Sequence, residues 1–373
     1  MHLLKKKLHQ EKKMEADSKL FEIWNQFDFD VDPINSEAEK KKFFSNKDSN
    51  PQFRYHPKEK LEQFQKNLLS LSSDNNWISN IVNQRRDIML TKIGMMLNRN
   101  AENFTSGSMN LFGFPSQELV STAKEDLKLE EEFEIKNLSD KDALGIISRA
   151  LGEMKLVHWN TQLKEDMSAS AKVDSAHKKI YIWKGESFSF AGVERLIVHE
   201  LQTHVIRMEN SARQKYKIFQ IGFPHYLETE EGLAAYNEEQ AEHLHHNKIK
   251  KTYAGRVLAV SLSLEKGFAD TFAELNKHFS DEDAWRLTLR AKRGLKDTSE
   301  AGGFTKDYIY LSGKLKVKKF FESEKDIGFS DIYRGRISLE HVEFLRNNLS
   351  EVQNPLYLPS LSTSLLNSFL PSI

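Results

Sequence analysis

Two histidines and a glutamate near the middle of the chain have the types and spacing that could support metal-assisted hydrolysis. Residues 194–207 read ERLIVHELQTHVIR, in which His199 and Glu200 are adjacent and His204 follows five residues after the first histidine. A zinc peptidase needs two neutral imidazoles on the metal and a carboxylate beside the attacking water. The pattern alone is weak, because two histidines that only form hydrogen bonds within a core helix would satisfy it too.

The five-residue spacing makes a specific structural demand. In the common HExxH motif the two histidines are four residues apart and share a helix face. At about 100° per residue, His199 and His204 would instead point about 140° apart in a regular α-helix. We therefore predict a π-type turn between them, a rare widening that clusters at functional sites. Glu200 lies between the apolar Val198 and Leu201, and a buried carboxylate requires a partner.

A second acidic stretch could supply a third ligand. Residues 229–236 read TEEGLAAY. We expect Thr229 to cap a new helix, so that Glu230 and Glu231 fall in its first turn. Acidic residues at that position either compensate the helix dipole or place one carboxylate on a metal. Gly232 would allow this helix to approach a neighbour closely.

The order of the expected elements predicts the fold class. We expect helices, from apolar residues that recur on one face, over residues 57–72, 78–99, 116–127, 139–155 and about 190–208. Short strands are expected at 154–162 and 178–184. Helices followed by a small sheet and further helices predict an α+β fold. It would be mostly helical, with a small antiparallel or mixed sheet beside the helix that carries the HExxxH motif.

We divide the chain into four parts by its charge and periodicity. Residues 1–30 are expected to form a charged, partly frayed N-terminal helix, and residues 31–150 a helical N-terminal region. Residues 151–350 would be the metallopeptidase catalytic region. Residues 351–373 form a C-terminal tail that either docks on the core or frays.

Composition narrows the functional classes. Lys plus Arg and Asp plus Glu both number 54, so the formal net charge is zero, which argues against a nucleic-acid binder. The chain contains no cysteine, so any metal must use His, Asp or Glu, and a reducing cytoplasm is the expected location. We expect neither a secretory signal nor a membrane span, because no apolar stretch is long enough for either role.

Several motifs together resemble a known family. They are residues 199–204 (HELQTH), 210–214 (NSARQ) and 230–234 (EEGLA), with weaker similarity at 50–55 (NPQFRY), 302–307 (GGFTKD) and 310–313 (YLSG). In combination they resemble the QEGLA-motif domain family, whose characterised members are microtubule-associated tyrosine carboxypeptidases. The resemblance spans about residues 30 to 350.

The resemblance implies a zinc enzyme with an HExxxH helix and a glutamate as third ligand. Carried over by position, the Zn²⁺ ligands are His199, His204 and Glu231, and Glu200 is the general base. The family often has Gln where this chain has Glu230. The implied activity is that of a carboxypeptidase, with a peptide or protein C-terminus as substrate and tyrosine as the residue that the family's members release. A tubulin substrate is not supported by this neutral chain, because an acidic lattice favours a basic surface.

The remaining roles have several candidates that the sequence does not rank. The oxyanion donor could be Tyr308, Tyr310, His225 or Lys306. The cation for the terminal carboxylate could be Arg207, Arg213, Arg290, Arg293 or Lys306. For each arginine the alternative is a structural ion pair.

Substrate binding and turnover leave further alternatives. An extended substrate is expected to pair with an edge strand, either 178–184 or 168–173. Two alternative functions are a zinc-binding regulatory module without turnover and a peptidase with a different substrate. Glu200 argues against the module, because a site that only binds metal does not need a general base.

Overall fold

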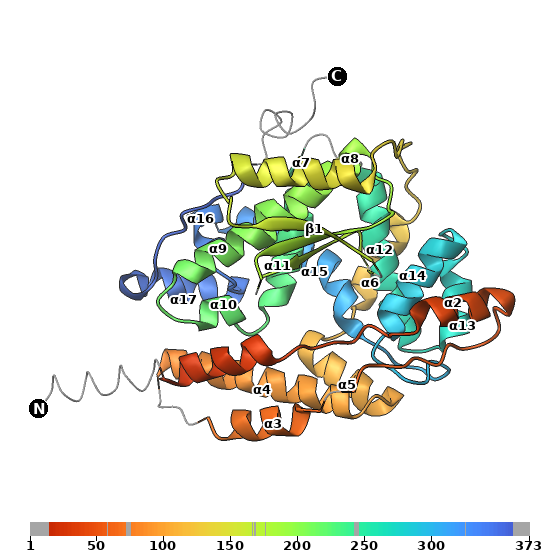
Figure 1. The fold of residues 1–373 in the computed structure, drawn as a ribbon, viewed down its shortest axis with the longest axis horizontal. Coiled ribbons are helices and arrows are strands. Elements are labelled where there is room, and N and C mark those ends of the chain that lie inside the picture. The colour runs from red at the N-terminus through yellow and green to blue at the C-terminus, as the bar shows by residue number, and fades with distance from the viewer. Residues whose placement is uncertain are drawn as a thin grey trace, which may run out of the picture. The chain divides into compact units, whose positions relative to one another are not determined.

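The computed structural model describes residues 15–57, 59–71, 76–165, 167, 169–175, 177–241, 246–324 and 326–360. The chain forms two compact units (Figure 1). Unit 1 comprises Met1–Lys128, Tyr216–His225 and Lys250–Ser312, and unit 2 comprises Leu129–Lys215, Tyr226–Ile249 and Gly313–Ile373. Residues 15–26 of the expected N-terminal helix are helical, whereas its first fourteen residues lie outside the described ranges. The four-part division of the chain stays a prediction.

In the described ranges, the regular secondary structure of unit 1 consists of helices. Its elements are α2 (Ser36–Ser45), α3 (Leu61–Leu69), α4 (Trp77–Leu97), α5 (Ala101–Phe112), α6 (Gln117–Asp126), α10 (Ile218–Ile221), α13 (Phe268–Leu275), α14 (Asp281–Lys292), the 3₁₀ helix η2 (Thr305–Tyr308) and most of α12 (His246–Ser263). An aromatic cluster fills part of the core, where the Phe43 ring lies 5.3 Å from Phe268 and 5.2 Å from Trp285. Burying such large rings supplies much of the stability of a helical unit.

The expected helices of unit 1 differ from the observed ones mainly at their ends. Helices α4 and α6 match the predicted ranges closely, whereas α3 is shorter than 57–72. Helix α5 was not predicted. Asn100 caps it by accepting a hydrogen bond from the Asn103 amide, and it ends where Gly113 has φ +76°. Asn caps and Gly ends are the usual signals of such a helix.

Unit 2 contains the sheet and the helices around it. Its elements are α7 (Asp140–Glu153), β1 (Asn160–Lys164), β2 (Ala171–Asp174), β3 (Lys179–Trp183), α8 (Phe190–Leu196), the π-helix η1 (Ile197–Val205), α9 (Ile206–Arg213), α11 (Tyr226–Gln240), most of α15 (Ile309–Ser323), α16 (Phe329–Ile332), η3 (Leu339–His341), α17 (Val342–Arg346) and η4 (Leu349–Glu351). The strand order is β1-β3-β2, with β1 parallel and β2 antiparallel to β3. The α+β prediction with a small mixed sheet is confirmed.

Two strand predictions were wrong in detail. The strand expected at 154–162 begins only at Asn160, because the chain turns after α7 and Lys155 adopts φ +59°. The segment at 178–184 is a strand, but β3 pairs on both sides and is therefore not an edge. The edges of this sheet are β1 and β2. Residue 168, at the start of the other predicted edge segment, lies outside the described ranges.

Helices cover one face of the sheet. Helix α7 packs over β1 and β3 (Figure 1), and Ser148 shares a hydrogen bond with Thr161 of β1 at 2.6 Å. Ile180 and Ile182 of β3 are fully buried, and β2 contacts η1. The alternation along β3 therefore places one side of the strand in the core next to the helix that carries the histidines.

Side chains of α9 hold the chain that precedes the C-terminal end. The Asn210 amide donates to the carbonyls of Tyr333 and Tyr357, both at 2.8 Å, and Gln214 exchanges two hydrogen bonds with the backbone of Gln353. The Gln202 side chain accepts from the backbone amide of Ser360 at 2.9 Å. Of the two alternatives for the tail, the structure therefore shows docking as far as Ser360. No helix in the described ranges combines the length and the apolar character needed to cross a bilayer.

Candidate metal centre

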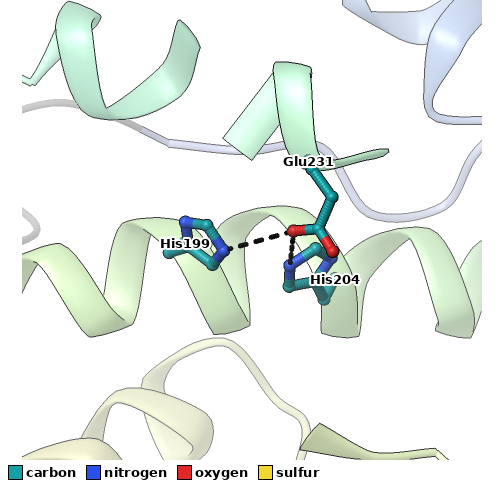
Figure 2. A group of neighbouring side chains, drawn as sticks. All are labelled: His199, His204 and Glu231. Atoms are coloured by element: carbon teal, nitrogen blue, oxygen red, sulfur yellow. Dashed lines mark ion pairs between the residues drawn. The ribbon is translucent and has the colours of Figure 1, made fainter. Parts of the chain in front are cut away.

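The helix that carries the two histidines widens where the sequence requires it. Residues Phe190–Arg213 run as α8, η1 and α9 without a break, and η1 is a π-helix over Ile197–Val205. The predicted π-type turn is confirmed. As a result the rings of His199 and His204 lie with centroids only 4.9 Å apart (Figure 2).

Glu231 of α11 faces both imidazoles. Its Oε2 lies 3.7 Å from Nε2 of His199 and 3.7 Å from Nε2 of His204 (Figure 2). One ligand atom from each of the three residues lies within 4.8 Å of the others. Glu231 is buried and the two histidines are nearly so. Two imidazole nitrogens and one carboxylate oxygen are the ligand types of catalytic zinc sites that leave one position for water.

The helix that supplies Glu231 begins earlier than the sequence suggested. Helix α11 starts at Tyr226, after His225 adopts φ +57°, so Thr229 is not its N-cap. The Thr229 hydroxyl instead accepts a hydrogen bond from the Leu339 amide at 3.0 Å. Glu230 and Glu231 therefore lie beyond the first turn, where compensation of the helix dipole is weak.

Gly232 allows the close helix approach that its position suggested, but the neighbour is α15. A Cβ atom added to Gly232 would overlap the backbone of Gly313, and one added to Gly313 would overlap the Glu228 carbonyl. Only glycine fits at both positions without a shift of one helix. The two glycines thus fix α11, and with it Glu231, against α15.

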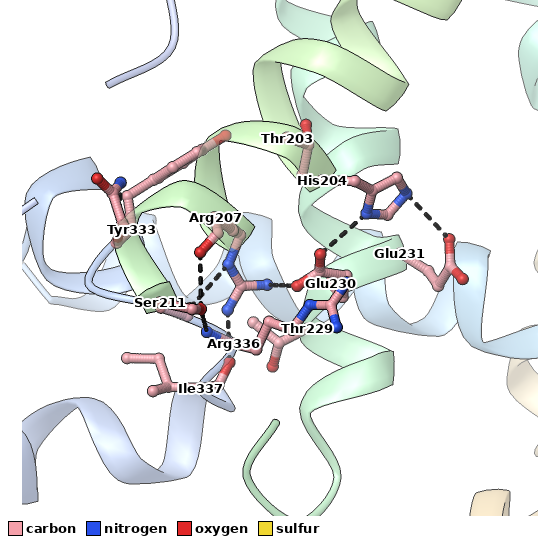
Figure 3. A network of polar contacts seen from close by, with 12 residues as sticks. Thr203, His204, Arg207, Ser211, Thr229, Glu230, Glu231, Tyr333, Arg336 and Ile337 are labelled. Atoms are coloured by element: carbon pink, nitrogen blue, oxygen red, sulfur yellow. Dashed lines mark hydrogen bonds and ion pairs between the residues drawn. The ribbon is translucent and has the colours of Figure 1, made fainter. Parts of the chain in front are cut away.

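Each imidazole is oriented by a second carboxylate. Nδ1 of His199 lies 2.8 Å from Oε1 of Glu238, which also accepts from Arg195 at 3.0 Å. Nδ1 of His204 lies 2.9 Å from Oε1 of Glu230, whose other oxygen pairs with the buried Arg207 (Figure 3). Because a carboxylate accepts hydrogen bonds, each Nδ1 carries a proton, and each Nε2 atom points toward Glu231. Such carboxylate–histidine pairs are typical of metal sites.

The two neighbouring glutamates of α11 have different surroundings. Glu230 contacts Arg207 and Nδ1 of His204, whereas Glu231 faces the Nε2 atoms. Burial acts to raise the pKa of Glu230, but Arg207 and then His204 outweigh it and lower that pKa below its usual value. The geometry thus favours Glu231 as a ligand and Glu230 as the acid that orients His204.

Glu200 is partly buried beside the same cluster. Burial raises the pKa of its carboxyl, the neighbouring Glu231 and Glu238 raise it further, and the two histidines oppose them. Burial also acts to lower the pKa of His199, yet the nearby carboxylates of Glu231 and Glu238 raise it well above its usual value. A cluster so rich in buried carboxylates favours a bound cation, and the donor set fits zinc.

The sequence did not single out Glu238 or Arg195. Both have a periodic relation to a ligand, since Glu238 follows Glu231 by seven residues and Arg195 precedes His199 by four. Residues at these spacings share a face of a helix. A search of the ligand-bearing faces for paired charges would have found them.

The candidates for the other roles have contacts of their own. Arg293 pairs with Asp32 at 3.0 Å and Asp307 at 3.4 Å, and Arg213 is exposed at the end of α9. Tyr308 donates a hydrogen bond to the Phe112 carbonyl. Tyr310 stacks on Tyr253 at 5.5 Å, and the Lys306 ammonium lies 5.9 Å from the Tyr310 ring. Of these five, only Arg213 belongs to unit 2. Their substrate roles stay predictions.

Comparison with known proteins identifies relatives of the chain. A family model described as microtubule-associated tyrosine carboxypeptidase matches residues 41–368. Microtubule-associated tyrosine carboxypeptidase 1 of Mus musculus is 27% identical over 329 residues, which cover 84% of this chain and 61% of that protein. The Rattus norvegicus protein of the same name is 31% identical over 182 residues, covering 45% and 36%. Putative tyrosine carboxypeptidase MATCAP2 of Mus musculus is 32% identical over 165 residues, covering 41% and 30%. The matches therefore span 30% to 61% of these relatives' own length.

Proposed function

We propose that this chain, which belongs to the family of microtubule-associated tyrosine carboxypeptidases, is a zinc-dependent carboxypeptidase that releases the last residue of a peptide or protein. The observation that supports the proposal most strongly is the convergence of His199, His204 and Glu231 within 4.8 Å. The names of the relatives make tyrosine the first terminal residue to test.

In this proposal His199 and His204 hold the zinc ion through Nε2, and Glu231 holds it through a carboxylate oxygen. Glu238 and Glu230 keep the two rings in the orientation that presents Nε2. Zinc in such a ligand set supplies Lewis acidity, which makes a nearby carbonyl more electrophilic and a water more acidic.

Glu200 is the proposed general base. Its carboxylate takes a proton from the attacking water and later passes that proton to the leaving amine. A carboxyl that must both accept and return a proton works best with a pKa near the working pH, and burial raises the pKa of Glu200 in that direction.

Strand β2 is the proposed guide for the substrate backbone. It lies at one edge of the sheet and contacts η1, the helix that carries the histidines. An extended peptide that adds a strand to this edge would bring its end toward the metal centre. The oxyanion donor and the cation for the terminal carboxylate are still to be chosen among Arg213, Arg293, Lys306, Tyr308 and Tyr310.

Two alternatives are kept open: a zinc-binding regulatory module without turnover, and a peptidase for another substrate. Nothing in this neutral chain favours tubulin over other acidic protein tails. A cytoplasmic location, inferred from the lack of cysteine, also stays a prediction.

The proposal is tested by incubating the zinc-loaded chain with a peptide library. The peptides end in Tyr, Phe, Ala or Glu, each with a free or an amidated carboxyl terminus, and mass spectrometry follows the products. We expect loss of one residue from peptides with a free terminus only. Glu200→Gln should lower the rate by about 10²- to 10⁴-fold, the usual contribution of a general base, with zinc content unchanged.

The matched control is Glu228→Gln on α11, because Glu228 pairs with the exposed Lys316 at 2.7 Å and lies outside the proposed machinery. Its activity should equal that of the wild type. A wild-type chain that is fully loaded with zinc and trims no peptide would contradict the proposal in favour of the regulatory module. Cleavage of amidated peptides at internal bonds would instead indicate an endopeptidase.

A further inference from the structure

A buried polar network contacts the widened helix without including any proposed ligand. Its members are Thr203 in η1, Asn237 in α11 and Tyr333 in the segment after α16. All three side chains are fully buried. Polar groups at such positions are usually hydrogen-bonded, so their partners indicate what they stabilise.

The hydrogen bonds of this network end on two backbone carbonyls of η1. The Asn237 amide donates to the hydroxyls of Thr203 and Tyr333, both at 2.8 Å. The Thr203 hydroxyl donates to the Val198 carbonyl at 3.1 Å, and the Tyr333 hydroxyl donates to the Gln202 carbonyl at 2.9 Å. The Tyr333 ring points toward the turn that carries Thr203 (Figure 3). The Asn237 amide therefore hydrogen-bonds two hydroxyls, and each hydroxyl donates to one backbone carbonyl of the widened turn.

The contact of Thr203 depends on the π geometry. In an α-helix a Thr hydroxyl bonds the carbonyl three or four residues earlier. Here it bonds Val198, five residues earlier. If η1 relaxed to an α-helix, this hydroxyl would lose its present partner, and the carbonyl at Gln202 would move away from Tyr333. The buried Tyr333 hydroxyl would then lose the carbonyl to which it donates, which is costly, so the network favours the wide turn.

We propose that Thr203, Asn237 and Tyr333 form a clamp that fixes the π geometry of η1 and so holds His199 and His204 in position for one ion. The clamp deepens the proposed function and rests on it for its biological purpose. Its members are positioning residues, since their hydrogen bonds act on the backbone of the helix that carries the histidines.

Both outer ends of the clamp are anchored. Asn237 shares α11 with Glu231 and Glu238, so a single helix supplies a proposed ligand, an orienting acid and the clamp. Tyr333 is held through its own carbonyl by Asn210 of α9 at 2.8 Å. The residues after Tyr333 are held by Arg207, which donates to the carbonyls of residues 335 and 337 (Figure 3).

The first test measures zinc affinity by competition with a chromophoric chelator in the full chain. Tyr333→Phe and Thr203→Val remove one hydroxyl each and keep the shape of the side chain. We expect each to weaken zinc binding about tenfold or more, as for other residues that orient metal ligands. Thr203→Ser keeps the hydroxyl and should retain the wild-type affinity.

The matched control is Tyr236→Phe, next to Asn237 on α11, whose ring packs on Phe321 and Phe329. It should leave zinc affinity unchanged. Equal zinc affinity in the wild type, Tyr333→Phe and Thr203→Val, even with a lower melting temperature of the variants, would mean that the network is only structural and would overturn the proposal.

The second test reads the helix geometry without any metal. The chain has no cysteine, so a variant that combines His199→Cys and His204→Cys can form only one intramolecular disulfide. In an α-helix, residues five apart are separated by about 7.5 Å along the axis. That separation exceeds the Cα distance of about 4.4–6.8 Å that a disulfide spans. The disulfide should therefore form only in the widened helix.

We expect this disulfide to form readily under mild oxidation by glutathione disulfide. Adding Tyr333→Phe should slow its formation at least severalfold, and adding Tyr236→Phe should not. An equal rate with and without Tyr333→Phe would overturn the clamp. Because no metal takes part, this result stands even if the wild type binds no zinc, an outcome that would contradict the proposed function alone.

Discussion

Two clusters, one in each unit, bury charged side chains in opposite ways. In unit 1 the buried Asp307 faces the guanidinium groups of Arg290 and Arg293. In unit 2 two imidazole nitrogens and the Glu231 oxygen, all electron-pair donors, face one another. In the first arrangement the opposite charges neutralise one another, so a structural role accounts for it. The second gathers donors around one point, which is an arrangement that a cation stabilises.

The pKa values of Asp307 and Glu200 differ in the same way as the two clusters. Burial acts to raise the pKa of Asp307, but Arg290 and then Arg293 hold it far below its usual value. Burial raises the pKa of Glu200 against the opposing effect of His199 and His204, and the neighbouring carboxylates raise it further. Charge that is compensated by the protein stays fixed as pH changes, whereas a carboxyl among other carboxyls is suited to exchanging a proton.

Asp307→Asn should give the largest loss of stability among these predictions. It would leave Arg290 buried without its strongest partner, which typically lowers the free energy of unfolding by about 3–5 kcal/mol. The control is Glu282→Gln, which breaks an exposed pair with Lys40 and should lower it by at most about 1 kcal/mol. Urea unfolding measures both. If both variants lost the same stability, the pairs of Asp307 with Arg290 and Arg293 would not be important for the stability of unit 1.

Asp17 offers a second buried carboxylate in unit 1, held by backbone amides instead of by arginine. It accepts from the amides of Lys217 and Ile218 at 2.6 and 2.7 Å, and burial raises its pKa from 3.8 to about 6. Because the folded state binds the proton more tightly, its contribution to stability is present below pH 3.8 and is lost as pH rises through 6. The pKa change corresponds to about 3 kcal/mol.

Urea unfolding of the wild type and Asp17→Asn at pH 4 and pH 7 measures this contribution. The advantage of the wild type over the variant should be larger at pH 4 than at pH 7. An advantage that grows toward pH 7 would show that the backbone amides outweigh burial. Asp17 would then resemble Asp307 in being held as a carboxylate.

The parts of the metal centre that follow from local periodicity could be predicted from the sequence. The spacing of His199 and His204 required a wide turn, and η1 provides it. The neighbouring residues suggested that Thr229 caps a helix. Its hydroxyl instead accepts a hydrogen bond from the amide of Leu339, which is far away in the sequence. Tyr333 could not have been found by spacing, because its role depends on how the C-terminal segment packs on α9.

The central position of β3 was missed for a related reason. Its sequence is that of a strand, but whether a strand lies at an edge depends on partners elsewhere in the chain. The roles of two residues in the segment 210–214 depend on distant partners in the same way. Asn210 and Gln214 are buried amides that hold distant backbone, which no local pattern reveals.

Zinc should stabilise the wild type but not a chain with an incomplete donor set. At a free zinc concentration of 100 times Kd the expected gain is about 2.7 kcal/mol, or a rise in melting temperature of about 3–4 °C for a chain of 373 residues. His204→Ala should lose this rise. His158→Ala should keep it, because His158 contacts Glu209 at 3.0 Å and not the proposed ligands. A rise of equal size in the wild type and His204→Ala, measured by scanning calorimetry, would place zinc elsewhere.

Gly232→Ala should give the smallest effect among these predictions. It tests whether helix packing positions the donor cluster. The added Cβ would overlap the backbone of Gly313 and force α11 away from α15, which lowers the free energy of unfolding by about 1–3 kcal/mol. The control is Gly145→Ala in α7, where an added Cβ meets nothing within 4 Å and Ala should stabilise the helix slightly. Since Glu231 precedes Gly232, zinc affinity should fall in Gly232→Ala and stay constant in Gly145→Ala. If Gly232→Ala loses stability but keeps its zinc affinity, the position of Glu231 does not depend on the contact between α11 and α15, and the contacts of α11 with η1 are sufficient to hold the donor cluster.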